Sequence, residues 1–215
     1  MPAIPDDAVH VHSVQEEYFY LMVHPCACGG AWLGDDQPME ETPARVTHHV
    51  AARCSRCKAQ QTFHFQYETP GNLKEPIRQV NPTADPSRAL DAAEWMGLAQ
   101  FYLGRIDRLT RDVEKAQSLL DARQCLEEAL KFYGPDDDGP PAAALWSDAS
   151  RQKAHRQAKA FRRETIGAML ARIPPMERLR KADSLDQKEF VKAVRQRAKE
   201  RAGRWWQFWK WGKKI

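Results

Sequence analysis

Four of the five cysteines stand in two close pairs along the chain. Cys26 and Cys28 form a C-x-C pair within HPCACGG, and Cys54 and Cys57 form a C-x-x-C pair within RCSRC, 25 residues later. Zinc is commonly held by four cysteine thiolates arranged as a tetrahedron. Two ligands on one tight turn are already close together, so two such turns can close on one ion. The spacing therefore predicts a Zn²⁺ site.

The compartment expected from the sequence supports metal binding over disulfide formation. The start of the chain, MPAIPDDAVH, is acidic and lacks the basic segment and apolar run of a secretory signal. A membrane-spanning helix needs about 20 consecutive apolar residues, and the sequence contains no such run. We therefore expect a cytoplasmic protein, possessing reduced thiols, in which paired cysteines are metal ligands.

Short strands are expected to position both cysteine pairs. The aromatic and aliphatic stretch at 18–23 is predicted to be a strand, and alternating apolar residues predict two more strands, at 45–53 and 62–67. Each pair would then lie at the end of a strand. Gly29 and Gly30 follow the first pair and tolerate the positive φ that a ligand turn can need.

These turns and strands resemble the zinc-ribbon modules over residues 18–67. In those modules a C-x-x-C-G turn, a small β-sheet and a second C-x-x-C turn surround one zinc ion. The resemblance implies a closed structural site with four ligands: Cys26, Cys28, Cys54 and Cys57. Because the first turn is one residue shorter here, His24 in place of Cys26, or His48 in place of one thiolate, stays an open alternative.

Three other interpretations of the paired cysteines are less favoured than a structural zinc site: metal-free thiols, a redox pair and a catalytic zinc. One alternative is that all four are buried free cysteines that bind no metal. A redox pair fits poorly, because Cys54 and Cys57 do not open a helix after a strand. A catalytic zinc would keep an open coordination position and usually has histidine or carboxylate ligands. Cys125 lies beside Leu126 in a helical pattern and is expected to be a small core residue.

The rest of the chain has a helical pattern, so the predicted fold class is α+β, a small antiparallel β module followed by an all-helical region. Helices are expected from Asp85–Pro86, over 111–134, over about 147–173 and from Ser184. The predicted parts are an arm at 1–17, the zinc-ribbon-like module at 18–67, a linker at 68–85, a helical region at 86–202 and a tail at 203–215.

Residues 95–134 resemble a tetratricopeptide-like helical hairpin. Trp95, Leu98 and Tyr102 have the spacing of a first repeat helix, and ARQCLEEALKFYG has the pattern of a second. Any pair of amphipathic helices gives such matches, and no second copy follows, although repeat arrays need about three copies to bury a core. We therefore expect one helical hairpin and no repeat array.

Charge is strongly segregated along the chain. Residues 151–215 hold 20 Lys/Arg and 6 Asp/Glu, a balance of +14, whereas residues 1–150 hold 13 Lys/Arg and 23 Asp/Glu, a balance of −10. A basic region of this kind favours an anionic partner, and nucleic acid is favoured over an acidic protein. The alternative is that the acidic and basic parts dock on each other.

Two groups of residues are candidates for partner contacts. The predicted anion-binding residues are Lys188, Lys192, Arg195, Arg197, Lys199, Arg201 and Arg204. The aromatic residues of the tail are Trp205, Trp206, Phe208, Trp209 and Trp211. Exposed aromatic rings can stack on unpaired bases. Tryptophan with lysine also favours a membrane surface, which would make the protein membrane-peripheral, and the rings can instead fold back and become buried.

No catalytic motif stands out in the sequence. It contains no glycine-rich phosphate loop, no H-E-x-x-H and no G-x-S-x-G. The acidic run at 136–138 lacks the alternating ligands and later glutamate of a calcium loop. We therefore expect a non-catalytic binding or adaptor protein, with an enzyme as the less favoured class.

Overall fold

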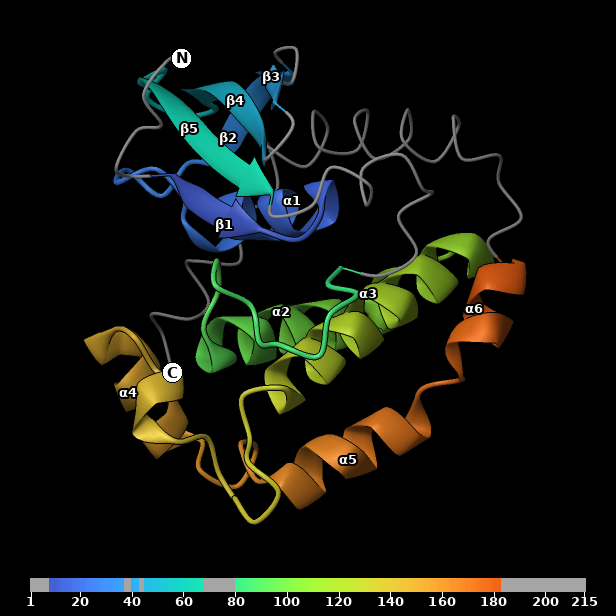
Figure 1. Ribbon diagram of the computed structural model, residues 1–215. Coiled ribbons are helices and arrows are strands. Elements are labelled where there is room, and N and C mark those ends of the chain that lie inside the picture. The colour runs from blue at the N-terminus through green and yellow to red at the C-terminus, as the bar shows by residue number, and fades with distance from the viewer. Residues whose placement is uncertain (1–7, 37–39, 43–44, 68–79, 183–215) are drawn as a thin grey trace. The chain divides into compact units, whose positions relative to one another are not determined.

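The computed structural model describes residues 8–36, 40–42, 45–67 and 80–182. The chain divides into two compact units, and within the described residues the boundary lies between Val80 and Asn81. In the described residues the first unit carries a sheet and helix α1 (Val14–Val23), and the second is helical, so the protein is α+β (Figure 1). Within the described ranges no helix has the length and apolarity needed to cross a membrane.

The described part of the first unit contains a five-stranded mixed sheet. Its strands are β1 (Val9–Val11), β2 (Trp32–Asp36), β3 (Glu40–Thr42), β4 (Arg45–Cys54) and β5 (Gln60–Tyr67). Their order is β1-β5-β4-β2, and β3 also pairs with β4. The expected antiparallel sheet is corrected at one edge, because β1 pairs in parallel with β5. A three-residue strand gives too short a pattern to be recognised in a sequence, and β1 falls within the predicted arm.

Residues 18–23 do not form the predicted strand. They belong to helix α1 (Val14–Val23), whose N-cap is Ser13. The Ser13 hydroxyl accepts a hydrogen bond from the Glu16 backbone N–H at 3.1 Å. Two acidic residues in the first turn also stabilise the helix, because negative charge interacts favourably with the positive end of its dipole. A short continuous apolar run fits either a strand or a buried helix. The cap, which lies upstream of that run, decides the outcome.

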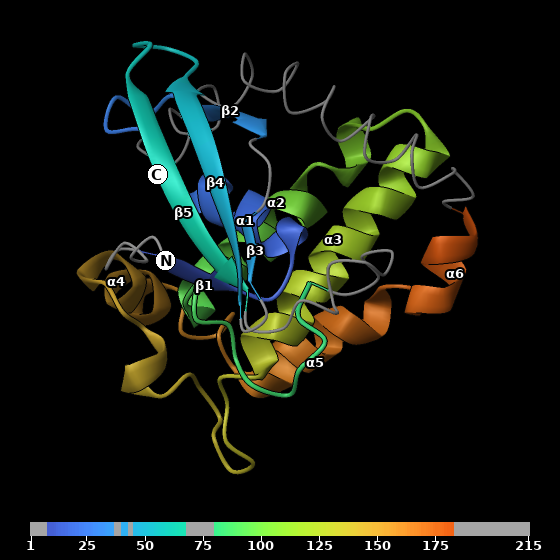
Figure 2. The same ribbon diagram turned by 45° about the horizontal axis from the view of Figure 1, so that its top comes forward.

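Strands β4 and β5 form a long hairpin, as the alternating pattern predicts (Figure 2). Phe63, Phe65 and Tyr67 are buried on one face of β5. Helix α1 packs on this face, where the ring of Tyr20 meets Phe63 and Phe65 edge-on, at centroid distances of 6.3 and 5.7 Å. Aromatic pairs of this geometry contribute about 0.5–1.5 kcal/mol beyond the area they bury. The hairpin and α1 therefore carry the core of the first unit.

The second unit is built around two long helices that lie side by side in both views (Figures 1 and 2). They are α2 (Ala92–Gly104) and α3 (Asp112–Leu130), joined through the short 3₁₀ helix η2 (Ile106–Arg108). The remaining helices are η3 (Ala142–Ala144), α4 (Asp148–Arg156), α5 (Arg163–Arg172) and α6 (Met176–Ala182). The expected helical hairpin is present, and Trp95, Leu98 and Tyr102 are buried in it.

Two helix boundaries differ from the prediction. The first long helix begins after Asp91 and not at Asp85–Pro86, because the Asp91 carboxylate accepts the backbone N–H groups of Ala93 and Glu94 in a capping box. The segment predicted over 147–173 is broken between α4 and α5. There Phe161 turns into the core, and its carbonyl accepts a hydrogen bond from the Tyr133 hydroxyl. The helix expected from Ser184 lies outside the described residues.

Candidate metal centre

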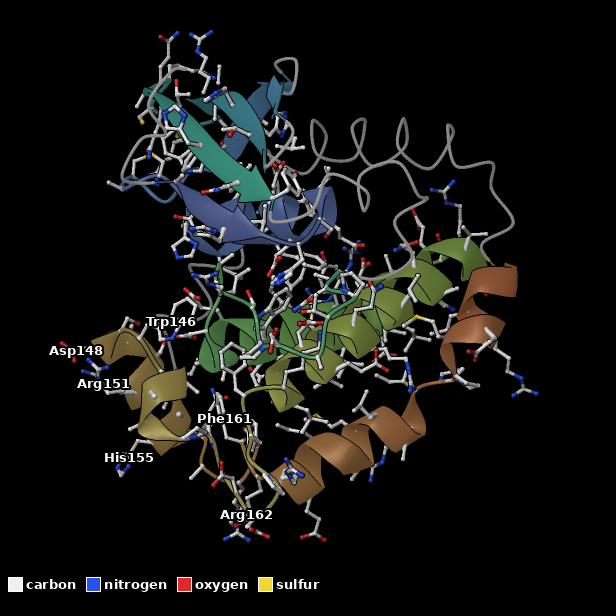
Figure 3. All side chains as sticks on the ribbon, viewed as in Figure 1. Trp146, Asp148, Arg151, His155, Phe161 and Arg162 are labelled. Carbon is white, nitrogen blue, oxygen red and sulfur yellow. The ribbon has the colours of Figure 1, made fainter. Side chains whose placement is uncertain are left out.

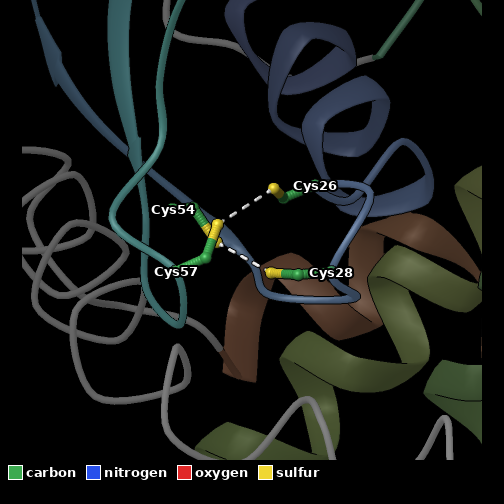
Figure 4. Close-up of side chains that lie close together, drawn as sticks. All are labelled: Cys26, Cys28, Cys54 and Cys57. Atoms are coloured by element: carbon green, nitrogen blue, oxygen red, sulfur yellow. Dashed lines mark hydrogen bonds between the residues drawn. The ribbon is translucent and has the colours of Figure 1, made fainter.

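The four paired cysteines meet at one point of the first unit (Figure 4). Their sulfur atoms all lie within 4.8 Å of one another. The closest contacts join one cysteine of each pair, 3.6 Å between Cys26 and Cys57 and 3.4 Å between Cys28 and Cys54. Four thiolates at about 2.3 Å from a tetrahedral ion stand about 3.8 Å apart. The sulfurs are therefore already close to the spacing that a single metal ion requires.

The first turn follows helix α1 directly, where a strand was expected. After α1 ends, the backbone N–H of Cys26 donates to the Gly30 carbonyl at 3.0 Å, and that of Gly29 donates to the Cys26 carbonyl at 2.6 Å. Gly29 has a φ of 75°, which glycine adopts without steric cost. The indole N–H of Trp32 donates to the His24 carbonyl and fixes the approach to the turn. This tight loop holds the C-x-C pair.

The second turn connects β4 to β5. The backbone N–H of Cys54 donates to the Ala59 carbonyl at 2.8 Å, and the N–H of Lys58 donates to the Cys54 carbonyl at 3.2 Å. The Arg56 guanidinium reaches across and donates to the Cys28 carbonyl at 2.8 Å. The backbone N–H of Ser55 also donates to the Ala31 carbonyl at 2.8 Å, so the two turns are joined by these hydrogen bonds as well as by the contacts between the cysteines.

The cysteines differ in how strongly their surroundings favour the thiolate. Burial opposes ionisation of Cys54, yet hydrogen bonds from the backbone N–H groups of Cys57 and Arg56, with help from neighbouring thiols, lower its pKa to about 6. The backbone N–H of Cys28 favours the thiolate of Cys26, but burial and the other three thiols raise the pKa of Cys26 to about 12. Without metal, crowded thiols cannot all ionise, whereas a bound cation removes that conflict.

Neither histidine alternative belongs to the cluster. In the described part of the chain the group that can hold a metal consists of the four cysteines. The ring of His24 stacks on Tyr20 at a centroid distance of 4.2 Å, and its Nδ1 lies 3.0 Å from the Tyr20 carbonyl. His48 lies 2.9 Å from the Glu17 carboxylate. The geometry therefore favours Cys26, and not His24, as the fourth ligand.

Gly30 is predicted to be essential for metal binding, for a steric reason. A Cβ at this position would lie 2.5 Å from the Cys54 sulfur and 2.8 Å from the Arg56 Cβ, whereas at Gly29 a Cβ would meet nothing within 4 Å. Gly30→Ala should weaken metal affinity by about 10- to 100-fold, the range seen when residues supporting a ligand are changed. Competition with a chromophoric chelator measures the affinity.

Gly29→Ala is the matched control for this substitution. Its positive φ makes alanine cost about 1–2 kcal/mol in stability, but no ligand is displaced, so affinity should stay within a few fold of wild type. Equal metal affinities for the Gly30 and Gly29 variants would contradict the proposed packing around Cys54.

A buried polar network lies next to the sheet and was not predicted from the sequence. The Tyr67 hydroxyl donates to the Glu17 carboxylate, which also lies 2.9 Å from Nδ1 of His48. All three side chains are buried, and burial together with the charge of Glu17 raises the pKa of Tyr67. Alternation does place His48 and Tyr67 on one sheet face. Glu17 joins them only because residues 14–23 are a helix.

The other predicted contact residues lie outside the described part of the chain. These are Lys188, Lys192, Arg195, Arg197, Lys199, Arg201 and Arg204, with Trp205, Trp206, Phe208, Trp209 and Trp211. Cys125 is fully buried in α3, as expected of a core residue, and burial raises the pKa of its thiol.

Comparisons with protein-family models, curated proteins and solved structures give no match for this chain.

Proposed function

We propose that the protein is a non-catalytic zinc-binding adaptor whose basic C-terminal residues engage nucleic acid. The observation that supports zinc binding is the group of four cysteine sulfurs within 4.8 Å of one another. Four thiolates complete the tetrahedron of a zinc ion and leave no position for substrate or water. The role of such an ion is to hold the two turns of the first unit together.

Ligand chemistry supports zinc over the other common metals. Thiolates are soft ligands, which select zinc, Cu(I) and iron–sulfur clusters, whereas magnesium, calcium and manganese prefer oxygen. The sulfur spacing fits one ion, and zinc favours the tetrahedral arrangement. A single iron ion would use the same ligands, and elemental analysis distinguishes the two metals.

The proposal for nucleic acid is based on charge. The balance of +14 over residues 151–215 is concentrated in basic side chains that include Lys192, Arg195 and Lys199. Lysine and arginine that neutralise phosphates release counterions, so such binding weakens steeply as salt rises. The aromatic residues at 205–211 add rings that can stack on unpaired bases.

Fluorescence anisotropy of a labelled 20-nucleotide oligo(dT) with the full chain tests this function. Each phosphate contact to a single strand contributes about 0.7 to the slope of log affinity against log salt. Arg195→Glu with Lys199→Glu should lower that slope by about 1.4 if both residues contact phosphate. Arg172→Glu with Arg178→Glu makes the same charge change at two exposed positions and is the control. Absence of binding at 20 mM salt would refute nucleic-acid binding.

A membrane-peripheral adaptor is the second candidate function, favoured by four tryptophans and a phenylalanine within residues 205–211. Tryptophan and lysine together are typical of the headgroup region of a bilayer. Co-sedimentation with vesicles of phosphatidylcholine and phosphatidylserine compares the full chain with a chain ending at residue 202. Equal pelleting of the two would exclude the tail as a membrane anchor.

A further inference from the structure

The described helical unit carries a basic surface of its own, distinct from the residues after 182. Residues 149–163 contain six Lys/Arg and no acidic residue. Two of these cations are partly buried and donate hydrogen bonds within the fold. Lys153 donates to the Ala93 carbonyl at 3.1 Å, and Arg163 donates to the carbonyls of Tyr133 and Gly134 at 3.0 and 2.7 Å. The other four cations are exposed: Arg151, Arg156, Lys159 and Arg162.

The exposed cations are available to an anionic ligand. Arg151 pairs with Asp148 at 2.7 Å and Arg162 lies 3.7 Å from Asp138, but these carboxylates are 89% and 74% exposed. Ion pairs this exposed contribute little to stability, so a phosphate can compete for the guanidinium. Arg156 has no ion pair with any other described residue.

Helical periodicity gathers part of this charge on one side of α4. At about 100° per residue, Arg151, His155 and Arg156 fall within an arc of about 140°, and this arc faces away from the buried Ala154. Figure 3 shows Arg151 and His155 on the outer side of α4, with Trp146 just before the helix. Arg151, His155 and Arg156 thus form one broad solvent-facing stripe, in which the two arginines carry the charge.

Trp146 provides an exposed ring beside this stripe. It is 47% exposed, and no other large hydrophobic side chain among the described residues is exposed. Its backbone N–H donates to the Asp91 carboxylate at 3.0 Å, and Phe132 meets its ring edge-on at 6.4 Å. The Arg151 guanidinium donates to the Leu145 carbonyl at 2.8 Å. These contacts fix the backbone at Trp146 and place its ring against Phe132, while about half of the residue's surface meets solvent.

We infer that Trp146, the basic stripe of α4 and the exposed Lys159 that follows the helix form a binding surface for single-stranded nucleic acid, which deepens the proposed function and rests on it. The cations fit the phosphate backbone, and an exposed indole is a platform for an unpaired base. A base within a duplex cannot reach this ring without leaving its stack. The surface therefore prefers single strands over duplexes.

Anisotropy measurements on the full chain with labelled oligo(dT) and with a duplex of equal length test this surface. Trp146→Ala should weaken oligo(dT) binding roughly 5- to 150-fold, the effect of losing one stacked base, and Trp146→Phe should restore most of it. Arg156→Glu with Lys159→Glu should lower the salt slope by about 1.4 for the single strand. Arg172→Glu with Arg178→Glu again serves as the control of equal charge.

The outcomes separate this inference from the proposed function. If the wild-type chain binds no nucleic acid, both are overturned. If it binds but Trp146→Ala and the Arg156/Lys159 variant bind as tightly as wild type, this surface is overturned and the proposed function stands. Equal losses on single strand and duplex would overturn base stacking. Loss of binding to anionic vesicles, with oligo(dT) binding unchanged, would assign the surface to membranes and overturn it as well.

Discussion

Removal of the metal is expected to unfold the first unit and to leave the helical unit folded. Structural zinc contributes about 10–16 kcal/mol of binding free energy in small domains, which matches or exceeds the 5–15 kcal/mol that stabilise a typical domain. In the proposed zinc-bound state the ion joins the turns at Cys26 and Cys54, and its removal would leave four crowded thiols facing one another. The helical unit has its own buried core, which includes Trp95 and Leu126.

Two-dimensional ¹H–¹⁵N NMR of the reduced protein measures this effect. After a strong chelator is added, the dispersed amide signals of β4 and β5 should collapse, while those of α2 and α3 should keep their positions. Re-addition of one equivalent of Zn²⁺ should restore the spectrum. Unchanged β4 and β5 signals in metal-free, reduced protein would contradict a structural role for the ion.

Glu17→Ala is expected to produce the second-largest loss of stability. Glu17 is 4% exposed. Its carboxylate accepts a hydrogen bond from the Tyr67 hydroxyl and lies 2.9 Å from Nδ1 of His48. Its removal leaves both partners buried without their acceptor. A buried donor that loses its acceptor costs about 1–3 kcal/mol, so the loss of both contacts should cost about 2–6 kcal/mol. Native-state hydrogen exchange of β5 amides in the zinc-loaded protein reports the free energy of opening of this unit.

Tyr67→Phe is the matched control for this network. It removes one hydroxyl and keeps the contact between Glu17 and His48, so its cost should be about 0.5–1.5 kcal/mol, or up to about 3 kcal/mol because the acceptor is charged. A Glu17→Ala protein as stable as Tyr67→Phe would show that the carboxylate adds nothing beyond the tyrosine contact.

The cysteine cluster and the β4–β5 hairpin could be predicted from the sequence because both follow simple spacing rules. Phe63, Phe65 and Tyr67 alternate with polar residues, and this period of two specifies a half-buried strand. Residues 18–23 carry no period, since six consecutive apolar or aromatic residues suit a strand and a buried helix equally. The Ser13 cap, which decides between them, lies outside that stretch.

Features that depend on distant contacts could not be predicted. The parallel pairing of Val9–Val11 with β5 joins residues more than 50 positions apart, and no local pattern encodes it. Asp85–Pro86 and Asp91 both have the residues of a helix start. Before Asp91 the chain forms a turn in which the Ser87 hydroxyl accepts the N–H groups of Ala89 and Leu90, and Leu90 is fully buried. The later helix start therefore goes together with the burial of Leu90, a tertiary contact that local sequence does not reveal.

The most direct test of the metal centre is elemental analysis of the reduced protein, purified without added metal. We expect one zinc ion per chain, its loss in the Cys54→Ser, Cys57→Ser double variant, and its retention in Cys125→Ala, which changes a buried cysteine of α3 outside the cluster. A reduced wild-type chain that contains no metal and takes up no Zn²⁺ would contradict the account.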